Sequence, residues 1–529
     1  MNRTTLSLAA VATALAAVTG FATLTAPASS SGTGADGKPA ASTGSRTRLP
    51  VERTGLLCPA PSDSEVADTT YTSFTPTGIP GTSRPADGAA TSSTPTAAPR
   101  ADLYPAATTT ADKPAPKDKK QTPDAKATAA KPLLTLTQPG KPVRLETDSA
   151  DATALIGKAT GAAAPGWTTQ QTTTVSGGDG RGMLGLSCPA PDTDLWFPGA
   201  STSAERQDYV HLTNPDDAAV VADIDLYGPE GELKSQLTEG VTVPARSSVP
   251  VLLSTLTAEK ATEDVTVHVT TRAGRLGAAV RAAHDEQGSD WLTASADPSG
   301  SLVLPGIPAD ATSVRLVAHA PGESDADLKI QLAGKTSTVT PAAAQSLHVK
   351  AGMTAAVDLK NLTRGEAGTL LLTPSQPGKK PPVVAALKVT RGSGDNQETA
   401  FIPAGGPIGE RATAAGSSAK GTTLTLTALT ADAQVKVTAS AGTEGGTPAT
   451  KTYTVKRGTT TAVVPSIPTG LKGTYALTAE TVSGGPVYAS RMLAEPEDGI
   501  PMFTVQPLED DRGTVEIPTA RQDLTVLTD

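Results

Sequence analysis

Two short segments of the chain match the patterns of catalytic or cofactor-binding loops. Gly180–Gly185 (GRGMLG) matches the GxGxxG pattern of dinucleotide-binding loops, and Ser417–Lys420 (SSAK) matches the SxxK pattern of penicillin-recognising serine nucleophiles. A dinucleotide site needs a helix directly after the glycines, whereas this segment leads into Cys188 and a proline, which cannot begin a long helix. The SxxK serine must start a buried helix, and this copy stands in an Ala/Gly/Ser-rich segment between repeats. We therefore interpret the first as a turn before a strand and the second as a linker.

The acidic and histidine residues do not combine into a convincing metal or acid–base site. The five histidines include no pair at the spacing of metal ligands. His284–Glu286 (HDE) is the best acid–base cluster, but it follows a predicted strand, where solvated polar residues are expected. Asp216–Asp217 and Asp223–Asp225 could form a calcium loop, yet calcium takes six to eight oxygens, and the second pair lies on the outer face of a predicted strand. We predict no catalytic residue, no metal and no cofactor.

The N-terminus indicates export. Met1–Arg3 is a short basic start, Leu6–Leu24 is an almost unbroken run of apolar and small residues, and Ala26–Ala28 provides the small residues that a signal peptidase reads. We expect cleavage after this segment. The alternative is an uncleaved anchor, because about 19 residues are just enough to span a bilayer. In either case the body of the chain is expected outside the cytoplasm.

Two cysteines and one aromatic pair are the remaining candidate functional residues. Cys58 and Cys188 each begin the tetrapeptide Cys-Pro-Ala-Pro, and two cysteines alone in an exported chain most simply form one disulfide. Zinc would need four ligands at short spacing, and a thiol nucleophile would need a base that the sequence does not locate. Trp196 and Phe197 are expected to pack in a core or between domains. Their alternative role is an exposed platform on which a sugar ring stacks.

Composition limits both the core and the partners. Aromatic residues make up only 3% of the chain, so the cores must be built from Val, Leu, Ile and Ala. The formal net charge of −9 argues against a nucleic-acid partner, which would need a clustered basic face. The one dense basic run, Lys113–Lys120, alternates with Pro, Ala and Asp and is typical of a solvated linker.

A tandem repeat organises the C-terminal part of the chain. Val243–Val251 recurs as Val349–Val357 and again as Val455–Val463, in two steps of 106 residues (349−243 and 455−349). A fixed spacing indicates one structural module copied in tandem. Strand signals alternate with period two, as in Val265–Val269, and Gly- and Pro-rich turns separate them. We predict an all-β fold of tandem immunoglobulin- or fibronectin-like β-sandwiches, with a barrel as the alternative.

The same signals divide the chain into segments. We expect the last strand of each repeat near Leu304, Phe401 and Phe503. Residues 84–130 contain almost no large apolar side chain and cannot offset their ordering entropy. The expected segments are a signal peptide or anchor (1–28), a flexible stalk (29–50), a split N-terminal β domain (51–80 plus 131–203), a disordered linker (81–130), β-sandwich repeats (204–308, 309–413 and 414–510) and a C-terminal tail (511–529).

Part of the chain resembles a known family. Gly182–Gly199, which contains Cys188-Pro-Ala-Pro and Trp196-Phe197, followed by Val210–Asp216 (VHLTNPD), is similar to the actinobacterial exported DUF5719 family. That family is uncharacterised, so the resemblance implies no catalytic or binding residue. It implies an envelope-associated protein of a high-GC Gram-positive bacterium.

These observations favour a structural or binding protein over an enzyme. We predict an exported cell-envelope protein that acts through the surfaces of its tandem sandwiches, without catalysis, on an unknown envelope protein or cell-wall glycan. Nucleic acid is not an expected partner, the membrane enters only through a possible N-terminal anchor, and the oligomeric state stays open. The alternative is a cell-wall polymer hydrolase with accessory sandwiches, which would need a pocket with convergent polar groups.

Overall fold

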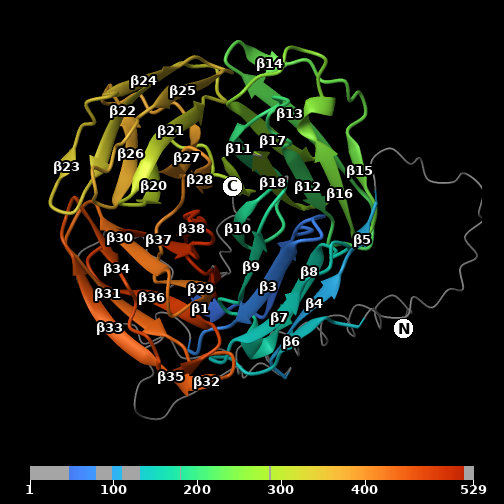
Figure 1. Cartoon of the computed structure of the whole chain (residues 1–529), viewed down its shortest axis with the longest axis vertical. Coiled ribbons are helices and arrows are strands. Elements are labelled where there is room, and N and C mark those ends of the chain that lie inside the picture. The colour runs from blue at the N-terminus through green and yellow to red at the C-terminus, as the bar shows by residue number, and fades with distance from the viewer. Residues whose placement is uncertain (1–46, 79–97, 110–130, 179, 285–286, 518–529) are drawn as a thin grey trace, which may run out of the picture. The chain divides into compact units, whose positions relative to one another are not determined.

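One arrangement of eight strand positions recurs four times in the computed structural model, which describes residues 47–78, 98–109, 131–178, 180–284 and 287–517. We number the strand positions 1 to 8 along the chain within each recurring set of strands. Each set then forms one sheet in the order 1-6-3-4 and a second sheet in the order 8-7-2-5. The fourth position is divided into two short strands in the second and third sets, and the fourth set has two additional short strands that pair only with each other. We name the four sets sandwiches I to IV (Figure 1).

Sandwich I covers residues 53–187 and sandwich II covers residues 194–292. The strands of sandwich I are β2 (Arg53–Cys58), β3 (Ala67–Phe74), β4 (Arg100–Pro105), β6 (Leu134–Leu136), β7 (Val143–Thr147), β8 (Leu155–Thr160), β9 (Thr168–Val175) and β10 (Gly182–Ser187), with a 3-10 turn η1 (Gly161–Ala163). The strands of sandwich II are β11 (Asp194–Ala200), β12 (Tyr209–Thr213), β13 (Val220–Gly228), β14 (Gly231–Leu233), β15 (Val241–Val243), β16 (Ser247–Leu252), β17 (Val265–Thr271), β18 (Gly277–His284) and β19 (Gly288–Leu292), with η2 (Leu253–Thr255).

Sandwich III covers residues 302–403 and sandwich IV covers residues 411–508. The strands of sandwich III are β20 (Leu302–Ile307), β21 (Ala311–His319), β22 (Ala326–Ala333), β23 (Thr338–Val339), β24 (Ser346–Val349), β25 (Thr354–Asp358), β26 (Gly368–Pro374), β27 (Val384–Ser393) and β28 (Asn396–Pro403). The strands of sandwich IV are β29 (Arg411–Ser417), β30 (Thr422–Ala428), β31 (Ala433–Ala439), β32 (Gly445–Thr447), β33 (Ala449–Val455), β34 (Thr459–Val463), β35 (Thr469–Lys472), β36 (Tyr475–Ser483), β37 (Val487–Ala494) and β38 (Phe503–Leu508).

Alternation of side chains builds each core. In β13, Val220, Ala222, Ile224 and Leu226 point inward and are at most 3% exposed, while the residues between them are only half-buried. Small aliphatic side chains with this period fill the space between the two sheets of a sandwich. The fold is all-β, as predicted. Its architecture is that of tandem sandwiches, although the immunoglobulin constant domain arranges its strands as ABED and CFG instead.

The repeated sequence segments occupy the same place in three sandwiches. Val243, Val349 and Val455 each end a strand at the fourth position, and the fifth strand follows directly as β16, β25 or β34. The repeat prediction is confirmed at these positions. The expected last strands are confirmed at Phe401 in β28 and Phe503 in β38, but Leu304 lies in β20, the first strand of sandwich III.

Three predicted boundaries lie too far along the chain. The boundaries at 204, 309 and 414 follow or cut β11, β20 and β29, which the structure places as the first strands of sandwiches II, III and IV. The reason is non-local pairing. β11 pairs with β17, and β20 pairs with β26, some 70 residues later in the chain, so the local pattern does not show to which module the first strand belongs.

The predicted linker and tail also contain ordered structure. β4 lies inside the predicted linker and is a central strand of sandwich I, between β8 and β6, with Leu103 only 1% exposed. β5 (Ala107–Thr108) pairs in parallel with β16 of sandwich II. In the predicted tail, Asp511 is buried against Arg411, and β39 (Thr514–Ile517) pairs with β1 (Thr47–Pro50), which ends the predicted stalk. The predicted signal peptide and the rest of the stalk, linker and tail lie outside the described residues.

Within the compact unit Arg48–Glu516, the four sandwiches form a ring (Figure 1). The first strand of each sandwich packs on the 8-7-2-5 sheet of the next: β11 on β21 and β27, β20 on β30 and β37, and β29 on β3 and β9. Leu57 of β2 makes the equivalent contact at the seam between I and II, where a Cβ on Gly277 would lie 2.7 Å from its side chain. The eighth strands, β10, β19, β28 and β38, contact one another in a closed cycle.

Asp290 of β19 joins all four sandwiches at the centre of this cycle. Its carboxylate accepts hydrogen bonds from the main-chain N–H of Gly185 in sandwich I (3.0 Å) and of Phe401 in sandwich III (3.4 Å). The hydroxyl of Thr504 in sandwich IV donates to both carboxylate oxygens at 3.2 Å. Asp290 is 1% exposed, and burial raises its pKa well above the ordinary value. One buried carboxyl group therefore satisfies donors from the three other sandwiches.

Glu398 of β28 is a second buried carboxyl group of the central strands. Its Oε1 accepts a hydrogen bond from the main-chain N–H of Met183 (3.0 Å), while its Oε2 has no partner among the described residues. Burial raises the pKa of Glu398 to about 8 from an ordinary value of 4.5. A carboxyl group with a raised pKa is protonated more readily in the folded than in the unfolded chain.

We expect Glu398 to make the ring less stable as the pH rises. Below pH 4.5 Glu398 is protonated in both the folded and the unfolded chain, so it does not lower the free energy of unfolding. Between pH 4.5 and about 8 the unfolded chain has lost this proton and the folded chain has not, so the free energy of unfolding falls as the pH rises. The total loss is on the order of 3–5 kcal/mol. In Glu398→Gln this component should vanish, so the difference in free energy of unfolding between variant and wild type should grow from pH 4.5 to 8. A difference that stays constant in denaturant titrations over this range would contradict the assignment.

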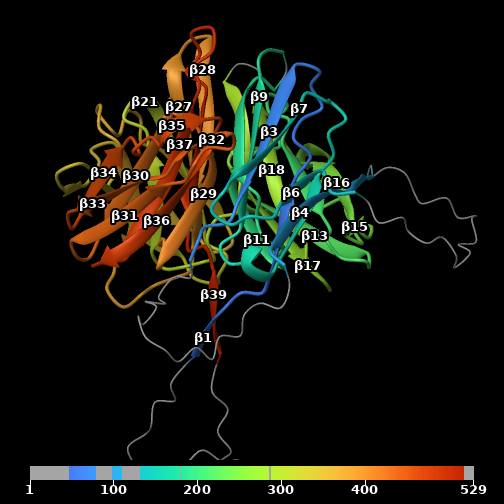
Figure 2. The same cartoon turned by 90° about the horizontal axis from the view of Figure 1, so that it is seen from below.

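The two ends of the unit lie together and connect sandwiches I and IV. Arg411 of β29 is 2% exposed, pairs with Asp511, and donates through Nη1 to the main-chain oxygen of Gly78 in sandwich I (2.8 Å). The main-chain N–H of Val51 donates to the oxygen of Gly513 (3.1 Å), next to the β1–β39 pair. β1 and β39 stand off the sandwiches on one face (Figure 2).

Candidate functional site

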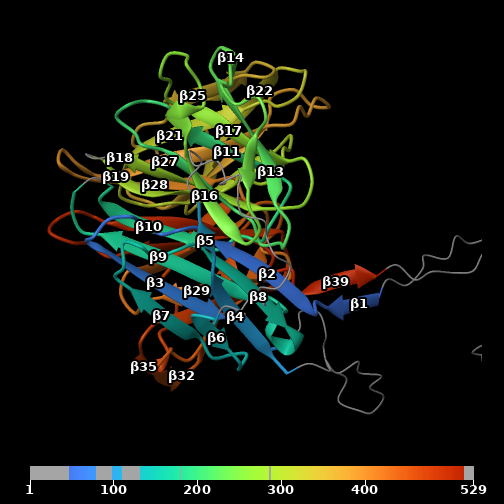
Figure 3. The same ribbon diagram turned by 90° about the vertical axis from the view of Figure 1, so that its right-hand side faces the viewer.

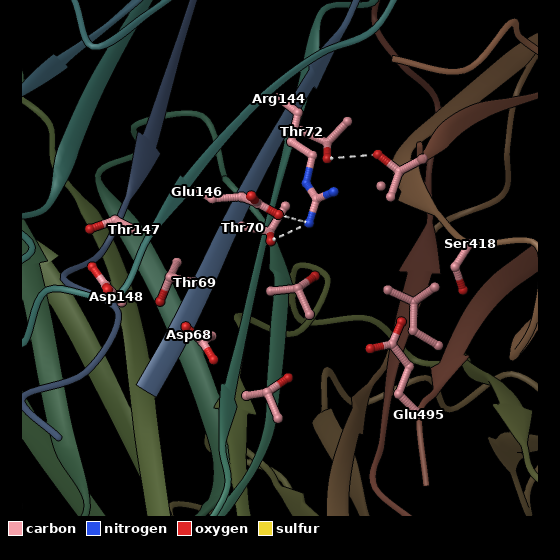
Figure 4. Close-up of a pocket in the computed structure, with 15 residues that line it drawn as sticks. Asp68, Thr69, Thr70, Thr72, Arg144, Glu146, Thr147, Asp148, Ser418 and Glu495 are labelled. Atoms are coloured by element: carbon pink, nitrogen blue, oxygen red, sulfur yellow. Dashed lines mark hydrogen bonds and ion pairs between the residues drawn. The ribbon is translucent and has the colours of Figure 1, made fainter. Parts of the chain in front are cut away.

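A cleft of about 610 Å³ lies at the seam between sandwiches I and IV (Figure 4). Its floor is one face of the sheet formed by β9, β3 and β7, whose strand order is visible in Figure 3. The register places Thr172, Thr70 and Glu146 in one row across the three strands, and Thr72 next to Arg144 in the following row. Alternation in the strands points these polar side chains to the same side. The floor is therefore an array of hydroxyl and charged groups.

Sandwich IV provides the opposite wall. The lining residues from this side are Gly416, Ser418, Thr474, Leu493 and Glu495. Gly416 lies close to the floor: its φ is +72°, and a Cβ there would lie 3.2 Å from the side chain of Gln170 in β9. The walls are bridged by a hydrogen bond of 3.5 Å between the hydroxyls of Thr72 and Thr474. A larger residue at 416 would be strained and would crowd this end of the cleft.

Negative charge dominates the lining. Arg144 pairs with Glu146 and donates to the hydroxyl of Thr70 (3.2 Å), so its charge is already compensated (Figure 4). Asp68, Asp148 and Glu495 are exposed, and none of them forms an ion pair with another described residue. A cationic group of a ligand could therefore pair with these three carboxylates without displacing a cation of the protein.

The other seams are bridged by direct contacts. Between sandwiches III and IV, the hydroxyls of Thr369 and Thr427 bond at 2.7 Å, and the hydroxyl of Thr460 donates to the main-chain oxygen of Ala333 at 2.7 Å. Between sandwiches II and III, Arg315 forms an ion pair with Asp264 (2.6 Å). At the seam between I and II the cavity found is only about 10 Å³. The cleft between I and IV leaves a polar sheet face open at its seam.

The predicted disulfide is present. The Sγ atoms of Cys58 and Cys188 lie 2.00 Å apart and their Cα atoms 4.7 Å apart, within the predicted range. Cys58 ends β2 and Cys188 follows β10, so the bond connects the two sheets of sandwich I. Both residues are buried, away from the residues that line the cleft. The disulfide is a structural cross-link.

The aromatic pair is buried. Trp196 is 7% and Phe197 is 0% exposed. The Trp196 ring stacks on His268, with centroids 3.5 Å apart, and its centroid lies 5.4 Å from that of His319 in sandwich III. Phe197 belongs to the core of sandwich II. The packing role fits these positions, and neither ring offers an open face to a sugar.

The motif-like segments have structural roles. Gly182–Gly185 lies in β10 rather than before a helix, as the turn-before-strand interpretation requires. Ser417 ends β29 and is buried, so Ser417–Lys420 is a turn inside sandwich IV and not a linker between repeats. Asp217 and Asp223 pair with Arg246 and Arg272. The described residues contain no group of three or more acidic, His or Cys side chains that could hold a metal. His284–Glu286 lies partly outside the described residues.

Sequence reasoning missed the cleft residues. Thr70, Thr72 and Thr172 belong to Thr-rich strands, and such composition also occurs in ordinary exposed strands. A detectable signal was the spacing of Leu136–Val143, which lies 107 residues before Val243 (243−136) and so continues the repeat into sandwich I. Recognising it would have placed β7 at the fifth position and identified four modules instead of three.

A family comparison covers most of the body. Residues 143–466 match the family described as a family of unknown function, DUF5719. The chain belongs to this family. The DUF5719 match begins at β7 and includes sandwiches II and III and most of the strands of IV. None of the curated proteins compared with the chain matches it. The described residues include no helix of sufficient length and hydrophobicity to cross a membrane.

Proposed function

We propose that this chain is an extracytoplasmic envelope protein of binding type, which holds a partner in the cleft between sandwiches I and IV and does not transform it. The observation that carries the proposal is the open polar sheet face at this seam, where the ring otherwise closes on itself. The N-terminal export signal and the disulfide support a location outside the cytoplasm. The partner classes that remain are an envelope protein and a cell-wall glycan.

The arrangement of the lining supports binding over hydrolysis. Hydrolytic carboxylates are held in place by their neighbours so that one acts as acid and another as base or nucleophile. In the cleft, Glu146 is engaged by Arg144, and the side chains of Asp68 and Glu495 have no hydrogen-bond partner among the described residues. This arrangement therefore favours binding over hydrolysis.

Filling the cleft should weaken binding. Thr172→Trp places an indole on the floor of the cavity at a half-buried strand position that tolerates aromatic residues. We expect retention of the purified full-length protein on envelope extract to fall about tenfold, a loss of about 1.4 kcal/mol in binding. Thr336→Trp, on an exposed turn of sandwich III, is the matched control and should bind as wild type.

The same assay tests the alternative. Unchanged retention of Thr172→Trp would reject the cleft as the binding site. Release of soluble fragments from wall polymer by the wild type, with loss of release in Glu146→Gln, would establish hydrolysis and overturn the proposal.

A further inference from the structure

The fifth strand of sandwiches II, III and IV is hydrogen-bonded across its seam to the preceding sandwich. β16 pairs with β5 of sandwich I. The main-chain N–H groups of Ala107 and Thr109 donate to the main-chain oxygens of Arg246 and Ser248, each at 3.0 Å. β34 donates through the N–H of Thr460 to the oxygen of Gly334 in sandwich III (2.8 Å). In β25 the hydroxyl of Thr354 performs this role.

In sandwich III, the side chain of Thr354 bonds across the seam to sandwich II. Its hydroxyl donates to the main-chain oxygen of Tyr227 in sandwich II (2.7 Å) and lies 3.0 Å from the hydroxyl of Thr266. Three of the four fifth strands are therefore connected to the sandwich before them. In two of these seams the connection uses the main chain of the strand itself.

β7, the fifth strand of sandwich I, lacks this connection. Like β25 and β34, it is the terminal strand of its sheet, in the order β10-β9-β3-β7, and pairs only with β3; it differs from them in having no bond across its seam to another described residue. Among the described residues, the main chain of Val143–Thr147 forms no hydrogen bond to sandwich IV. An unpaired strand edge presents alternating N–H and C=O groups that another extended chain can pair with. This free edge belongs to the strand that provides Arg144, Glu146 and Thr147 to the cleft lining.

We propose that the free edge of β7 binds an extended, basic segment of a partner protein by strand addition, with basic side chains reaching into the cleft. The inference rests on the proposed function and specifies its partner. Strand addition uses main-chain hydrogen bonds for affinity and alternate side chains for selectivity. The added strand would occupy the place that β5 fills on β16.

The cleft determines which segment fits. Alternate residues of an added strand face the same side as Arg144 and Glu146, toward Asp68, Asp148 and Glu495. Long cationic side chains reach these carboxylates, whereas acidic ones are repelled. The lining residues include no aromatic ring on which a sugar could stack. The combination of a free main-chain edge and uncompensated carboxylates favours a basic peptide over a neutral glycan.

Synthetic peptides test this directly with the full-length protein. A ten-residue peptide alternating valine and lysine should bind, and the same peptide with glutamate in place of lysine should bind at least about tenfold more weakly. Methylating alternate main-chain nitrogens on the pairing edge should also weaken binding about tenfold, because two main-chain hydrogen bonds are lost. The triple variant Asp68→Asn, Asp148→Asn, Glu495→Gln should weaken the lysine peptide about fivefold or more. Glu323→Gln, an exposed change in sandwich III, should have no effect.

The outcomes separate this inference from the proposed function. Equal binding of the methylated and unmethylated peptides, or of the lysine and glutamate peptides, would overturn strand addition by a basic segment. Displacement from envelope extract by a neutral oligosaccharide, without peptide binding, would also overturn it while leaving the cleft as the binding site. Failure of both peptide binding and cleft-dependent retention would reject the two proposals together.

Discussion

Replacing Asp290 by alanine should lower the free energy of unfolding by roughly 3–6 kcal/mol, because three buried donors lose their acceptor. These donors are the N–H groups of Gly185 and Phe401 and the hydroxyl of Thr504, each from a different sandwich. The hydroxyl of Thr504 keeps a bond of 3.3 Å to the oxygen of Gly185, so the main-chain donors carry most of the loss. Chemical denaturation of the full-length protein measures the effect.

Two further variants calibrate this result. Asp290→Asn keeps one carbonyl acceptor, so its loss should be smaller than that of the alanine variant. Asp395→Ala removes an exposed aspartate from the turn before β28 and should change stability by less than about 0.5 kcal/mol. If Asp290→Ala were no more destabilising than Asp395→Ala, the ring would not depend on its central carboxyl group.

Removing the disulfide should have an effect of similar size. The bond between Cys58 and Cys188 closes a loop of 130 residues, for which the chain-entropy relation gives on the order of 5 kcal/mol. The double variant Cys58→Ala, Cys188→Ala leaves no free thiol and should show a clearly lower thermal midpoint. The loss should be greatest in sandwich I, whose two sheets the disulfide connects.

A redox comparison provides the control for this variant. Wild-type protein treated with a reductant should melt close to the double variant, and the reductant should not change the variant itself. An unchanged melting temperature of wild type under full reduction would contradict a stabilising role for the bond.

Local patterns in the sequence predicted the layers of the fold but not the ring. Period-two strands and the recurrence of Val243, Val349 and Val455 indicate tandem sandwiches because side-chain alternation and turn chemistry are local properties. The assignment of β11 to sandwich II depends on pairing with β17, some 70 residues away. Ring closure depends on β29 contacting β3 and β9 from the opposite end of the chain.

The insertion in sandwich I concealed a fourth module. Its long Ala/Thr/Pro-rich segments surround β4, in which Leu103 and Tyr104 are the only large apolar residues. Burial of β4 is provided by β8 and β6 on either side, a contribution that composition alone does not reveal. The cleft was missed for a related reason, because Thr70 and Thr172 gain significance only from their position at the open seam.

Hydrogen exchange of the fifth strands tests the central claim most directly. In the free full-length protein, the amides of β7 (Val143–Thr147) should exchange faster than those of β16 and β34, which are bonded across their seams. Addition of envelope extract should slow exchange in β7 and leave β16 and β34 unchanged. Protection of β7 equal to that of β16 and β34 in the free protein, or partner-induced protection confined to another sandwich, would contradict an open binding seam between sandwiches I and IV.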